Sequence, residues 1–319
     1  MGALVSPPPL SMYTFWHNGY RAWKPHLTER RCSEDAFVST YRQMQLVAKG
    51  SASSVYRGVD RRSGRPVAIK TIVGAQHRAS ALREASILAA CGDDCVCDFV
   101  ETICADEETR IITEFLEGGD LFGRVFRENG FSEARAKIVL RQVASALDSL
   151  HAKGVAHLDV KPENICCHQC DQVKLVDFGS ARFFLSPVPA MSATTPDYAA
   201  PEIILASASL LPPPASPAID VYALGLLTFF VLTAEHPSKV RRRRDIGFYR
   251  PVVVAFEDDD DKDDELTIRQ RKRADEILWP RTLSPQARDF CNLCLQRDPK
   301  ARPSVSKLLD HPFLSSNNS

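Results

Sequence analysis

The hydrophobic pattern changes near Asp120, and this change limits the possible folds more than any other feature of the chain. Before Asp120, β-branched runs are separated by turn residues, and three runs are expected to be strands: 54–59, 66–72 and 110–114. One helical stretch, 78–90, interrupts them. After Asp120, apolar residues recur at three- and four-residue spacing, most clearly in 133–151, which follows the candidate N-cap Ser132. The sequence therefore predicts an α+β protein, strand-rich first and mainly helical afterwards.

The composition indicates a globular protein without a strong overall charge. The chain has 319 residues, which at about 150 residues per domain suggests two folding units. Lys and Arg number 40 together, as do Asp and Glu, so the net charge of zero predicts no binding to nucleic acid. The longest uncharged stretch without proline is 221–234, and it is shorter than a membrane-spanning helix, which needs about 18 residues. We therefore expect a buried helix there and no transmembrane segment.

Residues 1–40 are interpreted as an N-terminal extension, because a proline run is followed by aromatic residues without helix or strand periodicity. The rings expected to pack onto the rest of the protein are Tyr13, Phe15, Trp16, Tyr20 and Trp23. The first ten residues lack the basic start and apolar core of a secretory signal, so the ten cysteines are expected to be mostly free thiols. This favours a cytoplasmic location, with the nucleus as the alternative. Met1, Gly2 and Ser6 also fit the short N-myristoylation pattern.

A charged segment at about 239–275 interrupts the helical part. It contains a basic block at 241–244, an acidic block at 257–265 and a second basic block at 269–273. Blocks of like charge repel and tend to stay solvated, so a surface insertion is one interpretation. A docking loop for a partner protein and a nuclear-import signal are the alternatives.

Four short motifs follow one another along the chain. They are VAIK ending at Lys70, HLDVKPEN at 157–164, DFG at 177–179 and APE at 200–202. In this order and at these separations, they resemble the eukaryotic protein kinase family of the serine/threonine type. GGDLF at 118–122 is closest to the calcium/calmodulin-dependent group.

The resemblance covers nearly all of the chain beyond the extension. It implies the bilobal α+β protein kinase fold, with a kinase domain at 41–314 and a short tail at 315–319. The first lobe is expected at 41–116 and the second at 117–314. The implied activity is transfer of the γ-phosphoryl group of ATP, with Mg²⁺, to Ser or Thr hydroxyls of protein substrates.

Several residues match the catalytic positions of the family. On an alternating strand, Lys70 points away from the face that carries Val67 and Ile69, where it would bind the α- and β-phosphates. Glu84, on the helical stretch 78–90, is the expected partner of Lys70. The remaining catalytic and metal positions come later in the chain. Asp159 is expected to be the base, Lys161 to contact the transferred phosphoryl group, and Thr195 to bond to both of these residues. Asn164 and Asp177 are the expected Mg²⁺ ligands.

The nucleotide-covering loop departs from the family pattern, because only its central glycine is present. Its residues are Ala48, Lys49, Gly50, Ser51, Ala52, Ser53 and, after Ser54, Val55. Loss of the two outer glycines predicts a stiffer loop and weaker ATP binding. Segment 111–121 resembles the hinge between lobes: Thr113 is the gatekeeper, the backbone of Glu114 to Leu116 would bind adenine, and Asp120 would reach the ribose. Ala68 is expected beside the nucleotide.

Leu158 is the clearest departure, since the family usually has arginine between this histidine and aspartate. That arginine neutralises a phosphate on the activation segment. We therefore hypothesise that activity depends little on phosphorylation of the candidates Ser186, Ser192 and Thr194.

The resemblance also gives a substrate class. Lys161 and the run from Thr195 to Tyr198 are closer to serine/threonine than to tyrosine kinases, and Asp120 and Glu163 match positions that favour basic residues near the target. Two alternatives remain. One is a pseudokinase that binds nucleotide or acts as a scaffold, which the altered loop and Leu158 favour. The other is a small-molecule kinase on a related fold.

Structural residues complete the resemblance. Asp220 is expected to hold the backbone of the 157–159 loop, and Glu202 to pair with Arg302. The cysteines fall in groups at 91–104, 166–170 and 291–294, and we expect buried or free thiols rather than a zinc site, which needs four converging ligands.

Overall fold

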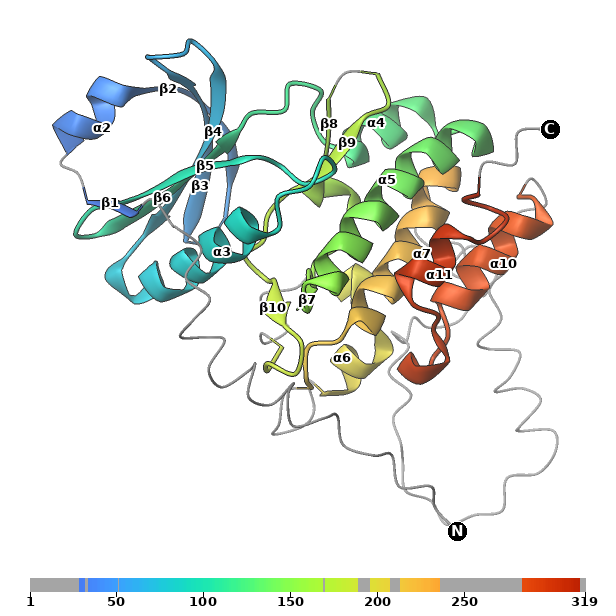
Figure 1. Ribbon diagram of the computed structural model, residues 1–319. Coiled ribbons are helices and arrows are strands. Elements are labelled where there is room, and N and C mark those ends of the chain that lie inside the picture. Colours follow the sequence, from blue (N-terminus) through green and yellow to red (C-terminus); the bar gives the residue numbers. More distant parts are fainter. Residues whose placement is uncertain are drawn as a thin grey trace, which may run out of the picture. The chain divides into compact units, whose positions relative to one another are not determined.

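The computed structural model describes residues 29–31, 34–50, 52–168, 170–188, 196–206, 213–235 and 283–315. The chain divides into two compact units, whose elements are labelled in Figure 1. The first unit comprises the chain up to Gly92 together with Asp98–Phe115. The second comprises Asp93–Cys97 and the chain from Leu116 onward.

The first unit is built around a sheet. Its elements are β1 (Glu29–Arg31), α2 (Glu34–Thr40), β2 (Tyr41–Lys49), β3 (Ser53–Asp60), β4 (Pro66–Val73), a 3₁₀ turn (Ala75–His77), α3 (Arg78–Ala90), β5 (Phe99–Cys104) and β6 (Glu108–Glu114). In the described part of the chain the strand order is β1-β5-β6-β4-β3-β2. Strands β2 to β6 pair antiparallel with their neighbours, whereas β1 pairs parallel with β5.

One face of this sheet carries an apolar cluster that includes residues of α2. Phe37 of α2 and Tyr41 pack with Val67 and Ile69 of β4, and Ile103 and Ile112 complete the cluster. The Arg110 guanidinium lies 4.0 Å from the centroid of the Phe37 ring, which adds a cation–π contact. Since side chains alternate along a strand, Lys70 lies on the opposite face, as the sequence predicts.

The extension expected at residues 1–40 contains two short elements that the sequence did not predict. These residues show no periodicity, yet the last twelve contribute β1 and α2 to the first unit. The strand and helix are too short to show a repeat, and their stability comes from pairing with β5 and from the buried Phe37. The aromatic residues from Tyr13 to Trp23 and the N-myristoylation pattern lie outside the described residues.

The second unit is mainly helical. Its elements are α4 (Leu121–Glu128), α5 (Glu133–Ala152), β7 (Val155–Ala156), a 3₁₀ turn (Pro162–Asn164), β8 (Ile165–Cys167), β9 (Val173–Leu175), β10 (Arg182–Phe183), a 3₁₀ turn (Pro196–Tyr198), α6 (Pro201–Ala206), α7 (Pro217–Thr233), α10 (Pro285–Cys294), a 3₁₀ turn (Pro299–Ala301) and α11 (Val305–Leu309). The charged insertion lies outside the described residues.

The predicted buried helix is α7, which is the centre of the second unit. It packs against α5 and α10, and most of its residues are buried. Gly225 permits the close approach of α10, because a Cβ atom there would lie 2.6 Å from Cβ of Cys294. None of the helices in the described ranges has the length and apolar character needed to cross a membrane.

Two short β pairings in the second unit position the loops that carry polar residues. Strands β8 and β9 form a hairpin, and β10 pairs antiparallel with β7. Residues 95–97 join β9 as well, since Cys97 N donates to Leu175 O at 3.1 Å and Leu175 N donates to Cys95 O at 2.8 Å. The loops at 157–164 and 176–181 are therefore held at both ends by backbone hydrogen bonds.

We predict that Phe37→Ala lowers the free energy of unfolding by about 3–5 kcal/mol, because the ring is 3% exposed and its loss leaves a cavity beside Ile69. Chemical denaturation followed by fluorescence measures the change. Val38→Ala is the matched control, because Val38 is 49% exposed on the same helix and should cost under about 0.5 kcal/mol. Equal effects of the two substitutions would contradict the packing described for α2.

Candidate active site

In the first unit, Lys70 and Glu84 form an ion pair. Lys70 Nζ lies 2.7 Å from Glu84 Oε1, and the two side chains are 19% and 8% exposed. Lys70 comes from β4 and Glu84 from α3, so the bond ties the helix to the sheet. A long lysine side chain held by a buried carboxylate is fixed in one direction, which suits it to bind an anion at a defined place.

The strand register gathers further predicted residues around Lys70. Val55 of β3 lies directly opposite Lys70, and Thr113 of β6 lies opposite Ala68. Residues directly opposite in neighbouring strands share a face, and Ala68 and Lys70 are two apart on β4. Val55, Ala68, Lys70 and Thr113 therefore occupy one face of the sheet. Ala48 lies opposite Val55 on β2 and extends the same group.

The loop between β2 and β3 is closed by a hydrogen bond from Gly50 N to Ser53 O at 2.8 Å. Gly50 does not have a positive φ, and a Cβ atom there would lie 3.2 Å from Oγ of Ser53. Gly50 is therefore suited to this position because a side chain would crowd Ser53, and not because the backbone is left-handed. Ala52 O accepts from Val73 N at 3.1 Å, which anchors the loop to β4. Ser51 lies outside the described residues.

In the second unit, the Asp159 carboxylate is the centre of a polar cluster. Its Oδ2 accepts from Lys161 Nζ and from Asn164 Nδ2, each at 2.8 Å. Asn164 Nδ2 also donates to the backbone oxygen of Asp159 at 2.9 Å. The Asp159 side chain is 10% exposed, so the carboxylate is held in one orientation by two donors and by limited contact with water.

Asn164 and Asp177 lie at the same end of the β8–β9 hairpin. Ile165 pairs with Leu175, and beyond this pair Val176 N donates to Asn164 O at 2.9 Å. Asp177 has a left-handed backbone with φ of 59°, and its Oδ1 accepts from Gly179 N at 3.3 Å. Phe178, which is 1% exposed, packs edge-on against the His157 ring at 5.0 Å and anchors the turn. The hairpin therefore brings both predicted metal ligands together.

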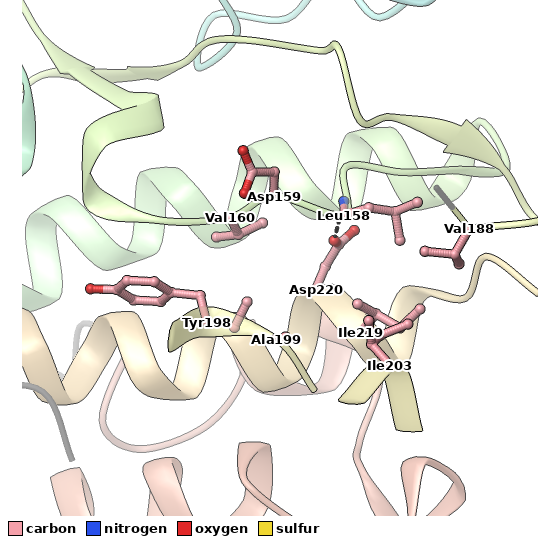
Figure 2. Close-up of a pocket in the computed structure, with 10 residues that line it drawn as sticks. Leu158, Asp159, Val160, Val188, Tyr198, Ala199, Ile203, Ile219 and Asp220 are labelled. Atoms are coloured by element: carbon pink, nitrogen blue, oxygen red, sulfur yellow. Dashed lines mark hydrogen bonds between the residues drawn. The ribbon is translucent and has the colours of Figure 1, made fainter. Parts of the chain in front are cut away.

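The loop that carries Asp159 is fixed by the buried carboxylate of Asp220, as the sequence predicts. Asp220 Oδ2 accepts from His157 N at 2.8 Å, and Oδ1 accepts from Leu158 N at 2.7 Å, which is drawn in Figure 2. His151 Nε2 lies 2.8 Å from the same carboxylate. Asp220 is fully buried at the start of α7, so three contacts replace its lost hydration.

The predicted pair of Glu202 and Arg302 is present. The guanidinium binds both carboxylate oxygens, with Nη1 2.7 Å from Oε1 and Nη2 2.8 Å from Oε2. Arg302 also donates to the carbonyl oxygens of Gln296, Ala218 and Arg297. The pair ties α6 to the segment between α10 and α11.

The family model of the protein kinase domain matches residues 41–314 of this chain. This chain belongs to the protein kinase family. A kinase named calcium/calmodulin-dependent protein kinase type I, from Schizosaccharomyces pombe, is 31% identical over 224 residues, which is 68% of this chain and 59% of that protein. A probable myosin light chain kinase of Dictyostelium discoideum is 26% identical over 282 residues, 85% of this chain and 66% of the relative.

A third relative, a serine/threonine-protein kinase of Drosophila persimilis, is 28% identical over 292 residues. The match covers 88% of this chain and 35% of the relative. The chain thus spans roughly a third to two thirds of the length of these relatives. The bilobal α+β fold expected from the motifs is confirmed by the family match and by the two units.

Other residues predicted to contact the nucleotide have structural partners in this chain. Glu114 N donates to Asp98 O at 3.0 Å, and its Oε1 accepts from Asp98 N at 2.7 Å. Leu116 is 7% exposed. Asp120 caps α4, because its Oδ1 accepts from Gly123 N at 2.7 Å. Lys49 pairs with Ser54 across the β2–β3 hairpin. Roles of these residues toward adenine and ribose stay predictions.

Some predicted residues fall outside the described ranges, and others were missed. Thr195, Ser192 and Thr194 lie outside the described residues. No local sequence pattern marks His151, because its contact with Asp220 joins positions 69 residues apart. Val188 was also missed, although it packs beside Leu158 in a buried cluster.

The cysteines in the described part of the chain are free thiols, and no group of three or more His, Cys, Asp and Glu side chains there is placed to hold a metal. Burial raises the pKa of Cys291 and of Cys294 on α10. Burial, with a smaller contribution from the Asp120 carboxylate, raises the pKa of the Cys166 thiol to about 12. These thiols are protonated at neutral pH and are poor metal ligands.

We predict that Glu202→Ala lowers the free energy of unfolding by about 3 kcal/mol, because it leaves the fully buried Arg302 side chain without its carboxylate. The remaining carbonyl acceptors keep the loss at the lower end of the usual range. Thermal and urea denaturation provide the measurement. Glu128→Ala removes a carboxylate that is 42% exposed and should change stability by less than about 1 kcal/mol. A loss no larger than that of the control would contradict the importance of the pair.

We predict that Cys166 is alkylated by iodoacetamide at pH 8 at least about tenfold more slowly than the exposed Cys170. Its raised pKa keeps the thiol protonated below pH 12, and the rate should still increase with pH as the thiolate forms. Peptide mass spectrometry of timed samples measures both rates. Labelling of Cys166 as fast as Cys170 would argue against a buried, protonated thiol.

Proposed function

We propose that this protein is a serine/threonine kinase that transfers the γ-phosphoryl group of ATP to Ser or Thr hydroxyls of protein substrates. The observation that carries the proposal is the Asp159 carboxylate, held by Lys161 and Asn164 in a chain of the protein kinase family. The Lys70–Glu84 pair supports the same function from the first unit.

The cluster around Asp159 suits hydroxyl activation. Asp159 orients the attacking hydroxyl and accepts its proton, while the hydroxyl oxygen bonds to the γ-phosphorus and the bond from that phosphorus to ADP breaks. Lys161 lies 2.8 Å from the carboxylate and places a positive charge where the transferred group becomes more negative. The two donors to Asp159 hold its carboxylate in one orientation.

The residues at the end of the β8–β9 hairpin fit Mg²⁺. Mg²⁺ favours oxygen ligands and commonly takes one or two from the protein, with the rest from phosphates and water. Asn164 Nδ2 donates to Asp159, so Oδ1 of Asn164 is the atom that would bind the metal. Asp177 supplies a carboxylate. When bound, Mg²⁺ neutralises charge on the ATP phosphates.

The sheet of the first unit is proposed to hold the rest of the nucleotide. Lys70 binds the α- and β-phosphates, and the shared face of Val55, Ala68 and Thr113 lies beside adenine. The loop from Ala48 to Ser53 covers the phosphates, and the backbone of Glu114 and Leu116 binds the adenine edge. Asp120 binds the ribose through the oxygen that does not cap α4.

The substrate class rests on fewer residues. Lys161, together with Thr195, favours Ser or Thr over Tyr as the acceptor. Asp120 and Glu163 favour basic residues near the target, and the charged insertion is proposed to dock protein partners. The cytoplasm, with the nucleus as the alternative, is the proposed location.

Two other functions are less well supported. A pseudokinase would be expected to lack part of the machinery, yet the Lys70–Glu84 and Asp159–Asn164 contacts are both formed. A small-molecule kinase would not need the Glu202–Arg302 pair, which supports the segment where protein kinases bind peptides. Phosphate transfer to an arrayed peptide library separates the second possibility from the proposal.

We predict that the purified protein transfers labelled phosphate from ATP to Ser- or Thr-containing peptides in the presence of Mg²⁺. Asp159→Asn should lower the rate about 10²–10⁴-fold, because the residue no longer accepts the proton. Lys70→Met should also remove activity. The matched control is Asp289→Asn on α10, whose carboxylate is 67% exposed and contacts only His311 among the described residues. Transfer that survives Asp159→Asn would contradict the assignment.

A further inference from the structure

A short backbone ladder holds residues 185–188, which we call the docked segment. Leu185 N donates to Ala215 O at 3.0 Å, and Ala215 N donates to Ser186 O at 2.7 Å. Val188 N donates to Pro213 O at 3.0 Å. This segment follows the DFG turn and β10, and the ladder fastens it to the stretch that precedes α7.

Apolar packing reinforces the ladder. Val188 is 4% exposed and lies in a cluster with Leu158, Ile203, Ala215 and Ile219. Figure 2 shows the side chains of Leu158 and Val188 pointing toward one another, beside Ile203 and Ile219. Leu158 stands where the family usually has arginine. The docked segment therefore contacts Leu158 through apolar side chains, and this contact does not need a phosphate.

The surroundings of Leu158 do not suit a phosphate group. The cavity beside Leu158 has a volume of about 10 Å³, which is room for about one water molecule. Its charged lining residues, among those the structure describes, are the carboxylates Asp159 and Asp220. A phosphate entering here would be desolvated next to two negative charges.

Ser186 is the residue through which the ladder can be opened. Its side chain is half-buried, Pro187 follows it, and its backbone oxygen accepts the hydrogen bond of Ala215. The arginine of β10, Arg182, donates from Nη1 to the carbonyl oxygens of Gly179 and Ala181, so this donor is directed at the DFG turn. A charged group on Ser186 would thus be partly removed from water, two residues before Val188 of the apolar cluster.

Leu158 by itself predicts that activity depends little on phosphorylation of Ser186, Ser192 and Thr194. We propose instead, for Ser186, that it is an inhibitory phosphorylation site, at which a phosphate releases the docked segment and lowers kinase activity. The proposal rests on the proposed function and deepens it. A protein kinase acting in trans with ATP supplies the group: Ser186 Oγ bonds to the γ-phosphorus, the bond to ADP breaks, and the hydroxyl proton passes to the base of that kinase.

The inhibitory sign follows from a comparison of the two states. A kinase binds its target serine in an extended segment, so Ser186 is modified while the segment is released. The phosphate carries a charge of about −1.5 to −2 and stays hydrated in the released state. Docking would remove part of that hydration beside Val188 and Leu158, with no arginine at position 158 to compensate. The modification therefore shifts the equilibrium toward the released state. In that state Leu158, the residue before Asp159, no longer packs against Val188, so the catalytic loop is held less firmly and activity falls.

The test compares the protein carrying phosphoserine at position 186, introduced by codon suppression, with the unmodified protein. We expect kcat/KM for a peptide substrate to fall by about tenfold or more, as the docked state loses population. Amide hydrogen exchange should accelerate at Leu185, Val188 and Ala215, whose N–H groups form the ladder. The amide of Phe131, bonded to Val231 O far along the chain, is the internal reference.

Matched variants test the cause. Leu185→Glu places a carboxylate one residue earlier on a side chain that is 66% exposed, and should leave activity and exchange unchanged. Leu158→Arg should reverse the effect, so that phosphoserine at 186 increases the activity of this variant above that of its own unmodified form. Unchanged or higher activity on modification of the natural sequence would overturn the proposal. An increase in activity that disappears with Lys153→Ala would also overturn it, because the phosphate would then act through this lysine. Lys153 is exposed and precedes Gly154, whose oxygen accepts from Phe184 N.

The two proposals fail in different ways. If the unmodified protein shows no Asp159-dependent transfer, the proposed kinase function is wrong. Exchange at Leu185 and Val188 still reports the ladder in that case, because it does not depend on catalysis. Unaltered exchange in the phosphoserine protein would overturn the inhibitory site even if the unmodified protein is an active kinase.

Discussion

The buried carboxylate of Asp220 is the interaction on which the arrangement of the second unit depends. A carboxylate without water must be neutralised or hydrogen-bonded, and here the backbone N–H groups of His157 and Leu158 meet that need together with His151. These bonds fix the backbone just before Asp159 and allow Leu158 a left-handed φ of 66°. Lys161 and Asn164 then hold the Asp159 carboxylate in one orientation.

A comparable constraint acts in the first unit, where the strand register decides which side chains meet. Ala68 and Lys70 on β4 share a face with Val55 and Thr113 only because β3 and β6 pair with β4 in this register. A shift by one residue would turn each of these side chains to the face that holds Phe37. The α2 helix secures the register indirectly, because its ring covers Val67 and Ile69.

Leu158 links the catalytic loop to the way the docked segment is held. The family commonly joins these two parts through an arginine and a phosphate, a charged contact that forms on modification. This chain joins them through Leu158, Val188 and a ladder of backbone hydrogen bonds, which need no modification. Adding charge nearby weakens an apolar contact, whereas it would strengthen a contact with arginine. Phosphorylation is therefore proposed to lower activity in this chain.

The sequence determined the family, the change from a strand-rich first part to a mainly helical second part, and the chemical identity of the site. Lys70, Asp159, Asn164 and Asp177 could be named because their spacing is local and recurs as motifs. Helix α5 could be predicted from its long hydrophobic repeat and α7 from its long uncharged stretch. Only the tertiary structure revealed that residues 29–40 belong to the first unit, that His151 supports Asp220 and that Val188 packs beside Leu158. Each of these depends on contacts between residues far apart in the chain, and β1 and α2 are too short for a periodic pattern. Local sequence records the preferences of a segment, whereas burial and pairing are decided by what the rest of the chain places beside it.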